Sequence, residues 1–287
     1  MKTCISSYSY SRLIKNGQMT LFDAIDKTAE LGIEGIEFTD LSAPEGMTEL
    51  EYAKQIRDYC ADKNLPIVSY TIGGRLLLED QEAEIARLKG KVDVAAALGA
   101  PTMRHDAAGA VPDWYHGVRT FDSVLPILAK GARAVTEYAA EKGVRTCTEN
   151  HGFFAQDADR VVRLIEAVNN VNYGTLVDMG NFTCADDRPD IAVGKVAPLA
   201  FHVHCKDMFV KNGSLPDPGK GWFRSRGGNY IRCTIIGHGD IPVQQCLTVL
   251  KTAKYDGYVS IEFEGMEDVM DGITIGLENL KRYIANA

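Results

Sequence analysis

The feature that most constrains the fold is a regular alternation of short runs rich in β-branched residues with longer amphipathic stretches. Such an alternation is typical of parallel sheets, because each helical crossover returns the chain to the same edge. The expected strands cover residues 3–7, 35–38, 67–71, 102–105, 144–149, 175–178, 200–204 and 258–263. The expected helices cover residues 20–31, 47–63, 80–98, 121–142, 157–168, 189–196, 242–254 and 266–286. Eight strands alternating with eight helices predict a (β/α)8 TIM barrel, an α/β fold.

An open, doubly wound sheet has a similar alternation and is the alternative fold. Nucleotide-binding sheets of that kind often carry a glycine-rich phosphate loop after the first strand. Residues 4–12 read CISSYSYSR, and neither GxGxxG nor GxxxxGK[ST] stands there. No linker divides the chain, so we expect one barrel domain over residues 1–287.

Composition narrows the partners that this chain can have. The formal net charge of −8 disfavours binding to a nucleic acid backbone. Residues 1–17 contain no apolar core of a signal peptide, and no apolar run is long enough to span a membrane. The seven cysteines are scattered without CxxC spacing, which favours reduced thiols and a cytoplasmic location.

One segment, residues 208–239, interrupts the alternation between the seventh strand and the following helix. It contains seven glycines, two prolines and five basic residues. A loop this long in a compact protein is usually a lid, a binding loop or an oligomer contact. Because it starts at the face where barrel active sites lie, we expect it to cover the site or reach a neighbouring subunit. Arg224 or Arg226 would then approach an anionic group, whereas a solvated surface loop is the alternative.

Four expected strands end on side chains that can bind a metal ion: Glu149, Asp178, His204 and Glu262. A carboxylate at the end of a buried strand is costly unless another charge compensates it. In a barrel these four strands are adjacent and open into one mouth, so the side chains could share a divalent cation. Three carboxylates and one imidazole suit Mn²⁺ first, then Co²⁺ or Mg²⁺, with Zn²⁺ a less typical match. From spacing alone His202 is an equal alternative to His204, since both lie on one face.

Four short segments make the chain similar to a known superfamily: ENHG at 149–152, VDMGN at 177–181, HVHCKD at 202–207 and GYVSIEFEG at 257–265. In this order they resemble the xylose isomerase-like TIM barrels. That superfamily includes ketose 3-epimerases, hydroxypyruvate isomerase, inosose dehydratase and endonuclease IV. The resemblance implies a single divalent metal, with His204 as the imidazole ligand and Glu262, rather than Glu264, as the last carboxylate. It also implies a homo-oligomer, since barrels of this superfamily often pair.

The resemblance also implies roles for the site residues. In the epimerases the two matching glutamates exchange protons with the substrate, which makes Glu149 and Glu262 the expected catalytic pair. Removing a proton beside a carbonyl requires a base near the carbon and a Lewis acid for the charge that develops. The side chains expected to contact substrate are His151, His202, Lys206, His105, Glu37, Arg224 and Arg226. For His202 the alternative is a hydrogen-bonding neighbour of the metal ligand. The roles of Glu264 and His238 stay open.

Two positions depart from the sugar epimerases. Asn181 stands where many have a histidine, and Val210 stands where they have an arginine. Both of those residues contact sugar hydroxyls, so a ketohexose is in doubt as the substrate.

We therefore expect a metal-dependent isomerase or epimerase of a small sugar or keto-polyol. One alternative is a lyase at the same site, either a dehydratase like inosose dehydratase or an enzyme that cleaves a sugar–aglycone bond. The others are an endonuclease IV-like phosphodiesterase and a non-catalytic sugar-binding protein.

Overall fold

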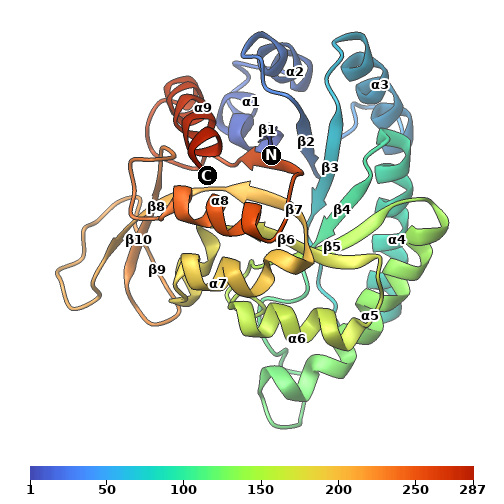
Figure 1. Cartoon of the computed structure of the whole chain (residues 1–287). Helices are drawn as coiled ribbons and strands as arrows, with labels where there is room; N and C mark the ends of the chain where they lie inside the picture. The colour runs from blue at the N-terminus through green and yellow to red at the C-terminus, as the bar shows by residue number, and fades with distance from the viewer.

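Eight parallel strands close into a barrel at the centre of the molecule (Figure 1). The structure is a computed structural model that describes residues 1–287. In order around the barrel the strands are β1 (Lys2–Ser6), β2 (Ile36–Thr39), β3 (Ile67–Ile72), β4 (Thr102–His105), β5 (Arg145–Glu149), β6 (Tyr173–Asp178), β7 (Ala200–Cys205) and β11 (Tyr258–Ile261). The predicted TIM barrel is confirmed, and every strand begins and ends within two residues of the range expected from sequence.

Helices surround the barrel and connect its strands. They are α2 (Leu21–Glu30), α3 (Glu49–Asp62), α4 (Gln81–Leu98), α5 (Phe121–Glu141), α6 (Ala158–Val168), α7 (Pro189–Val196), α8 (Val243–Thr252) and α9 (Val269–Asn286). Thr20 and Thr48 begin α2 and α3 with capping boxes that satisfy free backbone N–H groups. A short helix that the sequence did not predict, α1 (Ser11–Lys15), follows a 3₁₀ turn, Ser7–Tyr10. No helix combines the length and the apolar composition needed to cross a membrane.

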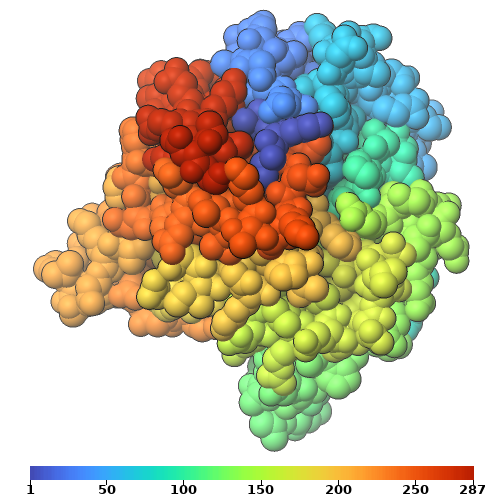
Figure 2. Space-filling view, viewed as in Figure 1, coloured from blue at the N-terminus to red at the C-terminus, as the bar shows by residue number.

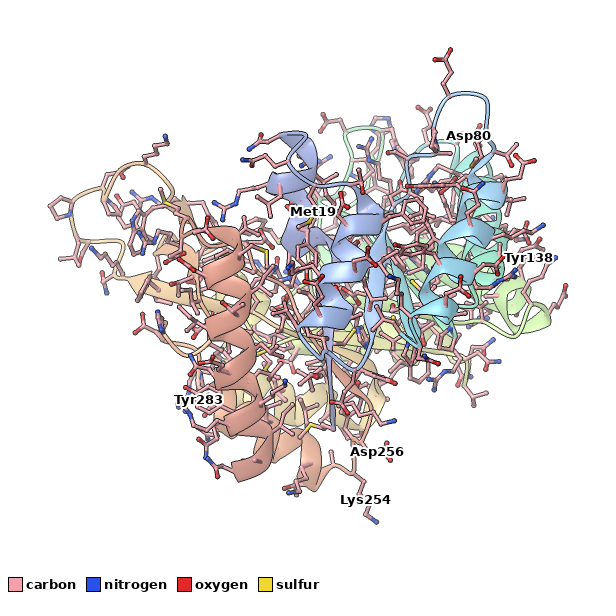
Figure 3. All side chains as sticks on the ribbon, turned by 90° about the horizontal axis from the view of Figure 1, so that it is seen from above. Met19, Asp80, Tyr138, Lys254, Asp256 and Tyr283 are labelled. Atoms are coloured by element: carbon pink, nitrogen blue, oxygen red, sulfur yellow. The ribbon has the colours of Figure 1, made fainter.

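The barrel has two distinct ends, which Figure 3 shows from the side. Lys254 and Asp256, in the turn before β11, lie at the end where the strands begin. Met19 and Asp80, which precede α2 and α4, lie at the opposite end, where the strands finish. The hydrophobic core joins the helices to the strands in one cluster, with Leu88 of α4 and Leu128 of α5 fully buried. Side chains at the carboxyl ends of all eight strands therefore converge on one mouth.

The segment 208–239 is not a loop, and this part of the sequence prediction is wrong. It contains most of a three-stranded antiparallel sheet formed by β8 (Asp207–Lys211), β10 (Tyr230–Thr234) and β9 (Phe223–Arg224). The paired runs DMFVK and YIRCT are rich in β-branched and aromatic residues, but many glycines and polar residues separate them. We call this segment the insertion sheet; it projects from the barrel beside α7 and α8 (Figures 1 and 2).

A buried carboxylate, Asp207, fixes both ends of the insertion sheet. Its two oxygens accept hydrogen bonds from the backbone N–H groups of Met208 (2.8 Å), Gly237 (2.8 Å), Gly239 (3.0 Å) and Ile241 (3.2 Å). The side chain therefore joins the first strand of the sheet to the segment that returns to α8.

Replacement of Asp207 by Ala should destabilise the protein by about 3 kcal/mol, because buried N–H groups lose a charged acceptor. Urea denaturation monitored by circular dichroism, with a metal chelator in every sample, measures this change. Lys220→Ala, at an exposed position of the same segment, is the matched control and should unfold like the native protein. Equal midpoints for the Asp207 variant and the control would contradict the role assigned to this carboxylate.

Candidate active site

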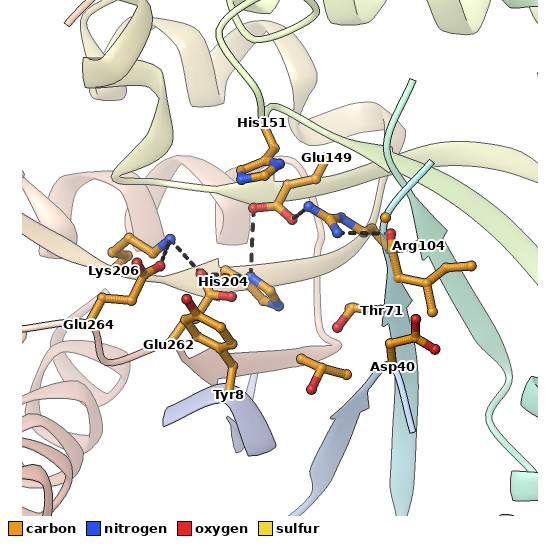
Figure 4. Close-up of a pocket in the computed structure, with 13 residues that line it drawn as sticks. Tyr8, Asp40, Thr71, Arg104, Glu149, His151, His204, Lys206, Glu262 and Glu264 are labelled. Carbon is orange, nitrogen blue, oxygen red and sulfur yellow. Dashed lines mark hydrogen bonds and ion pairs between the residues drawn. The ribbon is translucent and has the colours of Figure 1, made fainter. Parts of the chain in front are cut away.

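A polar cavity of about 290 Å³ opens at the carboxyl ends of the barrel strands (Figure 4). Only two of its 13 lining residues are hydrophobic, which suits a ligand rich in hydroxyl or carbonyl groups. The lining residues are Tyr8, Thr39, Asp40, Thr71, Ile72, Gly73, Arg104, Glu149, His151, His204, Lys206, Glu262 and Glu264.

The four predicted ligand side chains meet at the floor of this cavity. Each of Glu149, Asp178, His204 and Glu262 contributes one ligand-type atom, and these atoms lie within 4.8 Å of one another. His204 Nδ1 is 3.9 Å from Glu149 Oε1, 3.9 Å from Asp178 Oδ2 and 3.5 Å from Glu262 Oε2. Strand register explains the convergence, since Asp178 of β6 stands directly beside His204 of β7.

The chemistry of this group fits a divalent cation. Asp178 Oδ2 and His204 Nδ1 are buried without a hydrogen-bond partner. Burial, with the nearby carboxylates, raises the pKa of Asp178 to about 7. Two atoms that bind one ion at about 2.2 Å lie at most ~4.4 Å apart, and the distances from His204 Nδ1 fall inside this limit. A cation among three carboxylates and one imidazole would compensate the buried charge.

A second buried carboxylate, Glu37 of β2, orients the imidazole of His204. Glu37 Oε1 lies 2.6 Å from His204 Nε2, and Glu37 Oε2 lies 2.7 Å from His202 Nε2. Burial opposes the charge on Glu37, yet the two imidazoles hold its pKa well below its usual range. The contact at Nε2 turns His204 Nδ1 toward the three carboxylates, an arrangement common for metal-binding histidines.

Glu37 and His202 lie below the cavity, although both were expected to contact substrate. Neither lines the cavity, and both side chains are buried. Together with His204 they form a compact group of three possible ligands, but Glu37 already pairs with both imidazoles. The spacing of His202 and His204 in the sequence made them equal candidates for the metal ligand, and the tertiary structure distinguishes between them. Only His204 joins the group with Glu149, Asp178 and Glu262.

Lys206 places a buried positive charge beside the carboxylates. Its Nζ lies 2.6 Å from Glu262 Oε2, 2.6 Å from Glu264 Oε1 and 3.4 Å from Asp178 Oδ2. Burial opposes this charge, but the three carboxylates raise the pKa of Lys206 well above its usual value. Glu264 thus pairs with Lys206 and stays outside the four-atom ligand group.

Arg104 is a cavity residue that sequence reasoning missed, and the expectation that His105 faces the mouth is wrong. Neighbouring residues of a strand point to opposite faces, so only one of the two can face the cavity. Arg104 Nη2 lies 2.6 Å from Glu149 Oε2. The His105 ring packs 6.1 Å from the Tyr173 ring outside the cavity lining, and burial lowers its pKa. The last two residues of TMRH are both polar, so the sequence pattern does not show which of them faces the cavity.

His151 lines the cavity as expected, with its ring held by Asp106. His151 Nδ1 is 3.0 Å from Asp106 Oδ1, which leaves Nε2 without a protein partner. Burial lowers the pKa of His151, but the contact with Asp106 and the nearby charge of Glu149 together outweigh it, so the pKa is raised. Sequence reasoning did not single out Asp106 or the cavity residue Tyr8, because neither completes a motif; Tyr8 lies in the 3₁₀ turn after β1.

The two arginines expected to reach substrate are engaged elsewhere. The guanidinium of Arg224 stacks on the ring of Tyr230 at 3.7 Å from its centroid. Arg226 donates to Phe153 O at 3.0 Å and pairs with Asp157 Oδ2 at 2.8 Å. Neither lines the polar cavity, and no residue of 208–239 does. The insertion sheet is therefore not a lid over the candidate metal site in this structure, and its contacts with the 151–157 segment place it at the mouth end.

Comparison with known proteins identifies the family. Residues 25–283 match the family model described as xylose isomerase-like TIM barrel. The chain therefore belongs to this family, as the sequence resemblance predicted. It is 25% identical over 138 residues to inosose dehydratase of Bacillus thuringiensis (strain Al Hakam), a match that covers 48% of this chain and 46% of that protein. The match thus spans about half the length of this curated relative.

Solved structures of the same architecture superpose on the whole chain. One described as the IolI protein with a binding zinc atom has a TM-score of 0.76 at 14% identity, covering 100% of this chain and 99% of the other. L-ribulose 3-epimerase has a TM-score of 0.74 at 16% identity, covering 99% and 95%. At these identities the similarity establishes the fold. The named matches thus include a dehydratase by sequence and an epimerase by fold alone.

Replacement of Asp178 by Asn should lower the divalent metal content, because the site loses one of three anionic ligands. The measurement is metal per chain by mass spectrometry after dialysis against Mn²⁺ or Zn²⁺. Glu278→Gln, an exposed change on α9, is the control for the loss of one negative charge. Metal content equal to that of the control would exclude Asp178 as a ligand.

Replacement of Glu37 by Gln should weaken metal binding about 10–100-fold, because His204 loses the carboxylate that orients it. Isothermal titration with Mn²⁺ measures the affinity directly, independently of turnover. The Glu278→Gln protein should bind Mn²⁺ with the native affinity. An unchanged affinity in the Glu37 variant would show that packing alone orients the imidazole.

Proposed function

We propose that this protein is a divalent-metal-dependent isomerase or epimerase of a small sugar or keto-polyol. The observation that carries the proposal is the position of two glutamates in one polar cavity. Glu149 ends β5 and Glu262 follows β11, so β6 and β7 separate them around the barrel. Their carboxylates approach the cavity floor from different sides (Figure 4). A substrate carbon held between them would have an acid or base on each face.

The proposed metal site consists of Glu149, Asp178, His204 and Glu262, and we favour Mn²⁺ over Co²⁺, Mg²⁺ and Zn²⁺. A cation bound there would stabilise negative charge on the carbonyl and an adjacent oxygen of the substrate. Support comes from the short distances within this donor set and from the zinc atom named for the similar IolI structure. The preference for Mn²⁺ rests on the predominance of oxygen ligands.

The two glutamates are held in different ways. Arg104 contacts Glu149 Oε2, and Asn181 Nδ2 donates to Glu149 Oε1 at 2.8 Å, so both of its oxygens are oriented. Glu262 directs Oε2 toward His204 and Lys206. Burial opposes its charge, but the ammonium of Lys206 and the imidazole of His204 hold its pKa well below its usual value. We assign the first proton removal to one glutamate and proton return to the other; isomerisation would need only one of them.

The remaining cavity residues would bind and orient the substrate. His151 Nε2, the ammonium of Lys206 and the hydroxyl of Tyr8 border the cavity and can hydrogen-bond to hydroxyl or carbonyl oxygens. Asp40, on the opposite wall, can accept a hydrogen bond from a substrate hydroxyl.

Homo-oligomer formation and a cytoplasmic location stay predictions from the sequence.

A dehydratase is the second candidate, favoured by one observation of the site. The Lys206 ammonium sits at the cavity wall beside Glu262, where it could protonate a departing hydroxyl group. The curated relative named above is an inosose dehydratase. Both reactions begin by removal of a proton beside a carbonyl, so they differ only in the following step.

Incubation of the Mn²⁺-loaded protein with a panel of ketoses and keto-polyols in D₂O tests the proposal. Deuterium at one carbon without loss of water supports an isomerase or epimerase. Deuterium exchange accompanied by loss of water supports a dehydratase instead. No exchange into any ketose, with metal bound, would count against both.

Replacement of either Glu149 or Glu262 by Gln should lower the exchange rate by about 10³-fold, because glutamine cannot take up a proton. The rate of deuterium incorporation by NMR is the readout, with metal content measured in the same samples. Glu278→Gln serves again as the control for charge. Native exchange rates in both variants, with metal bound, would remove the two glutamates from the chemistry.

A further inference from the structure

A second, smaller cavity of about 140 Å³ adjoins the polar one. We call it the side chamber. Its lining residues are His151, Gly152, Phe153, Gln156, Asn181, Cys184, Lys206, Met208, Phe223, Cys233 and Glu264. Three of them, His151, Lys206 and Glu264, also line the polar cavity. One ligand could therefore occupy both spaces, with its two parts joined near these shared residues.

The insertion sheet supplies one wall of the side chamber through Met208, Phe223 and Cys233. Hydrogen bonds tie this wall to the barrel. The backbone N–H of Arg226 donates to Cys184 O at 2.8 Å, and its side chain donates to Phe153 O at 3.0 Å. Nearby, Ser225 Oγ donates to Asp186 Oδ1 at 2.6 Å. The chamber is thus formed before any ligand arrives, which reduces the entropy that binding must overcome.

Five of the 11 residues that line the side chamber are hydrophobic, against two of 13 in the polar cavity. Phe153, Met208 and Phe223 contribute carbon and sulfur surface. Burial raises the pKa of Cys184 and of Cys233 to about 12. Both thiols therefore stay neutral at physiological pH and behave as small hydrophobic groups.

Three polar side chains of the side chamber are already engaged by the protein, whereas His151 Nε2 and Glu264, both shared with the polar cavity, can still contact a ligand. Gln156 accepts from the backbone N–H of Phe153 and donates to Asn181 O at 2.7 Å. Asn181 in turn donates to Glu149, and Lys206 is paired with Glu262 and Glu264. Away from these two shared residues, a polar ligand group would lose water without gaining a free partner, which costs free energy. An apolar group would bury surface at no such cost.

We propose that the side chamber is a subsite for a ring-sized apolar substituent, so that the substrate is an aryl-substituted sugar or polyol. An engineered apolar cavity of about 150 Å³ binds benzene, which makes one aromatic ring the size that this chamber accepts. The polar part of the substrate would lie in the adjoining cavity, and this part of the inference rests on the proposed function. The apolar part rests on the side chamber alone.

The test uses 4-fluorophenol as a probe of the side chamber, with ¹⁹F NMR as the readout. We expect saturable binding to the native protein. Cys233→Phe fills the chamber and Phe223→Ala removes part of its wall; each should weaken binding by at least about tenfold. Phe223 is 38% exposed, so its replacement tests the proposal even if the larger side chain at position 233 prevents folding. Val210→Ala, on the same sheet but outside the chamber lining, is the control.

No binding to the native protein, or equal binding to all variants that fold, would overturn the subsite. The probe requires neither metal nor turnover. Its failure would therefore leave the proposed isomerase or epimerase activity intact. Conversely, absence of deuterium exchange with the ketose panel would not affect the result with 4-fluorophenol.

Discussion

The site depends on one imidazole placed between carboxylates on both of its sides. Glu37 lies 2.6 Å from Nε2 of His204, and three further carboxylates lie within 3.9 Å of Nδ1. So many acidic groups in a buried space repel one another unless positive charge separates them. The barrel brings them together because β2, β5, β6, β7 and β11 all direct side chains to one end. A divalent cation at Nδ1 would complete the charge balance on that side.

Two fixed cations, Arg104 and Lys206, supply part of this balance from the protein itself. Each lies 2.6 Å from one of the glutamates to which we assign proton transfer. Their contacts restrict the rotamers of Glu149 and Glu262, so each carboxylate is oriented before substrate binds. The same cations border the polar cavity. They can therefore hold the oxygens of a substrate as well as the carboxylates that act on it.

The insertion sheet extends the common barrel beside its polar cavity. It leaves the polar cavity open and instead adds an apolar wall beside it. Barrel enzymes vary the segments after their strands while the strands hold the chemistry in place. Here Asp207, the first residue of β8 and two positions after the end of β7, holds this added sheet through four backbone hydrogen bonds. One short stretch of chain, 204–207, thus contributes to the candidate metal site, the buried cation and the support of the side chamber.

The sequence by itself determined the barrel and the four side chains that meet at its mouth. Alternation of strand and helix patterns is local information, and strand ends can be read from the runs that contain Glu149, Asp178, His204 and Glu262. Strand spacing left His202 and His204 equivalent, and the family resemblance favoured His204. The tertiary structure gives the physical reason, because Glu37 of a distant strand contacts both imidazoles whereas only His204 joins the three carboxylates.

Other site features were equally invisible in the sequence. Arg104 replaced His105 at the cavity because the face of a short strand is set by its pairing with neighbours, not by the chemistry of its last residue. The side chamber exists only because Phe223 and Cys233 pack near Phe153 and Cys184, residues that lie about 40 to 80 positions away in the chain. Such contacts between distant segments leave no periodic signal in the sequence, whereas the alternation that builds the barrel does.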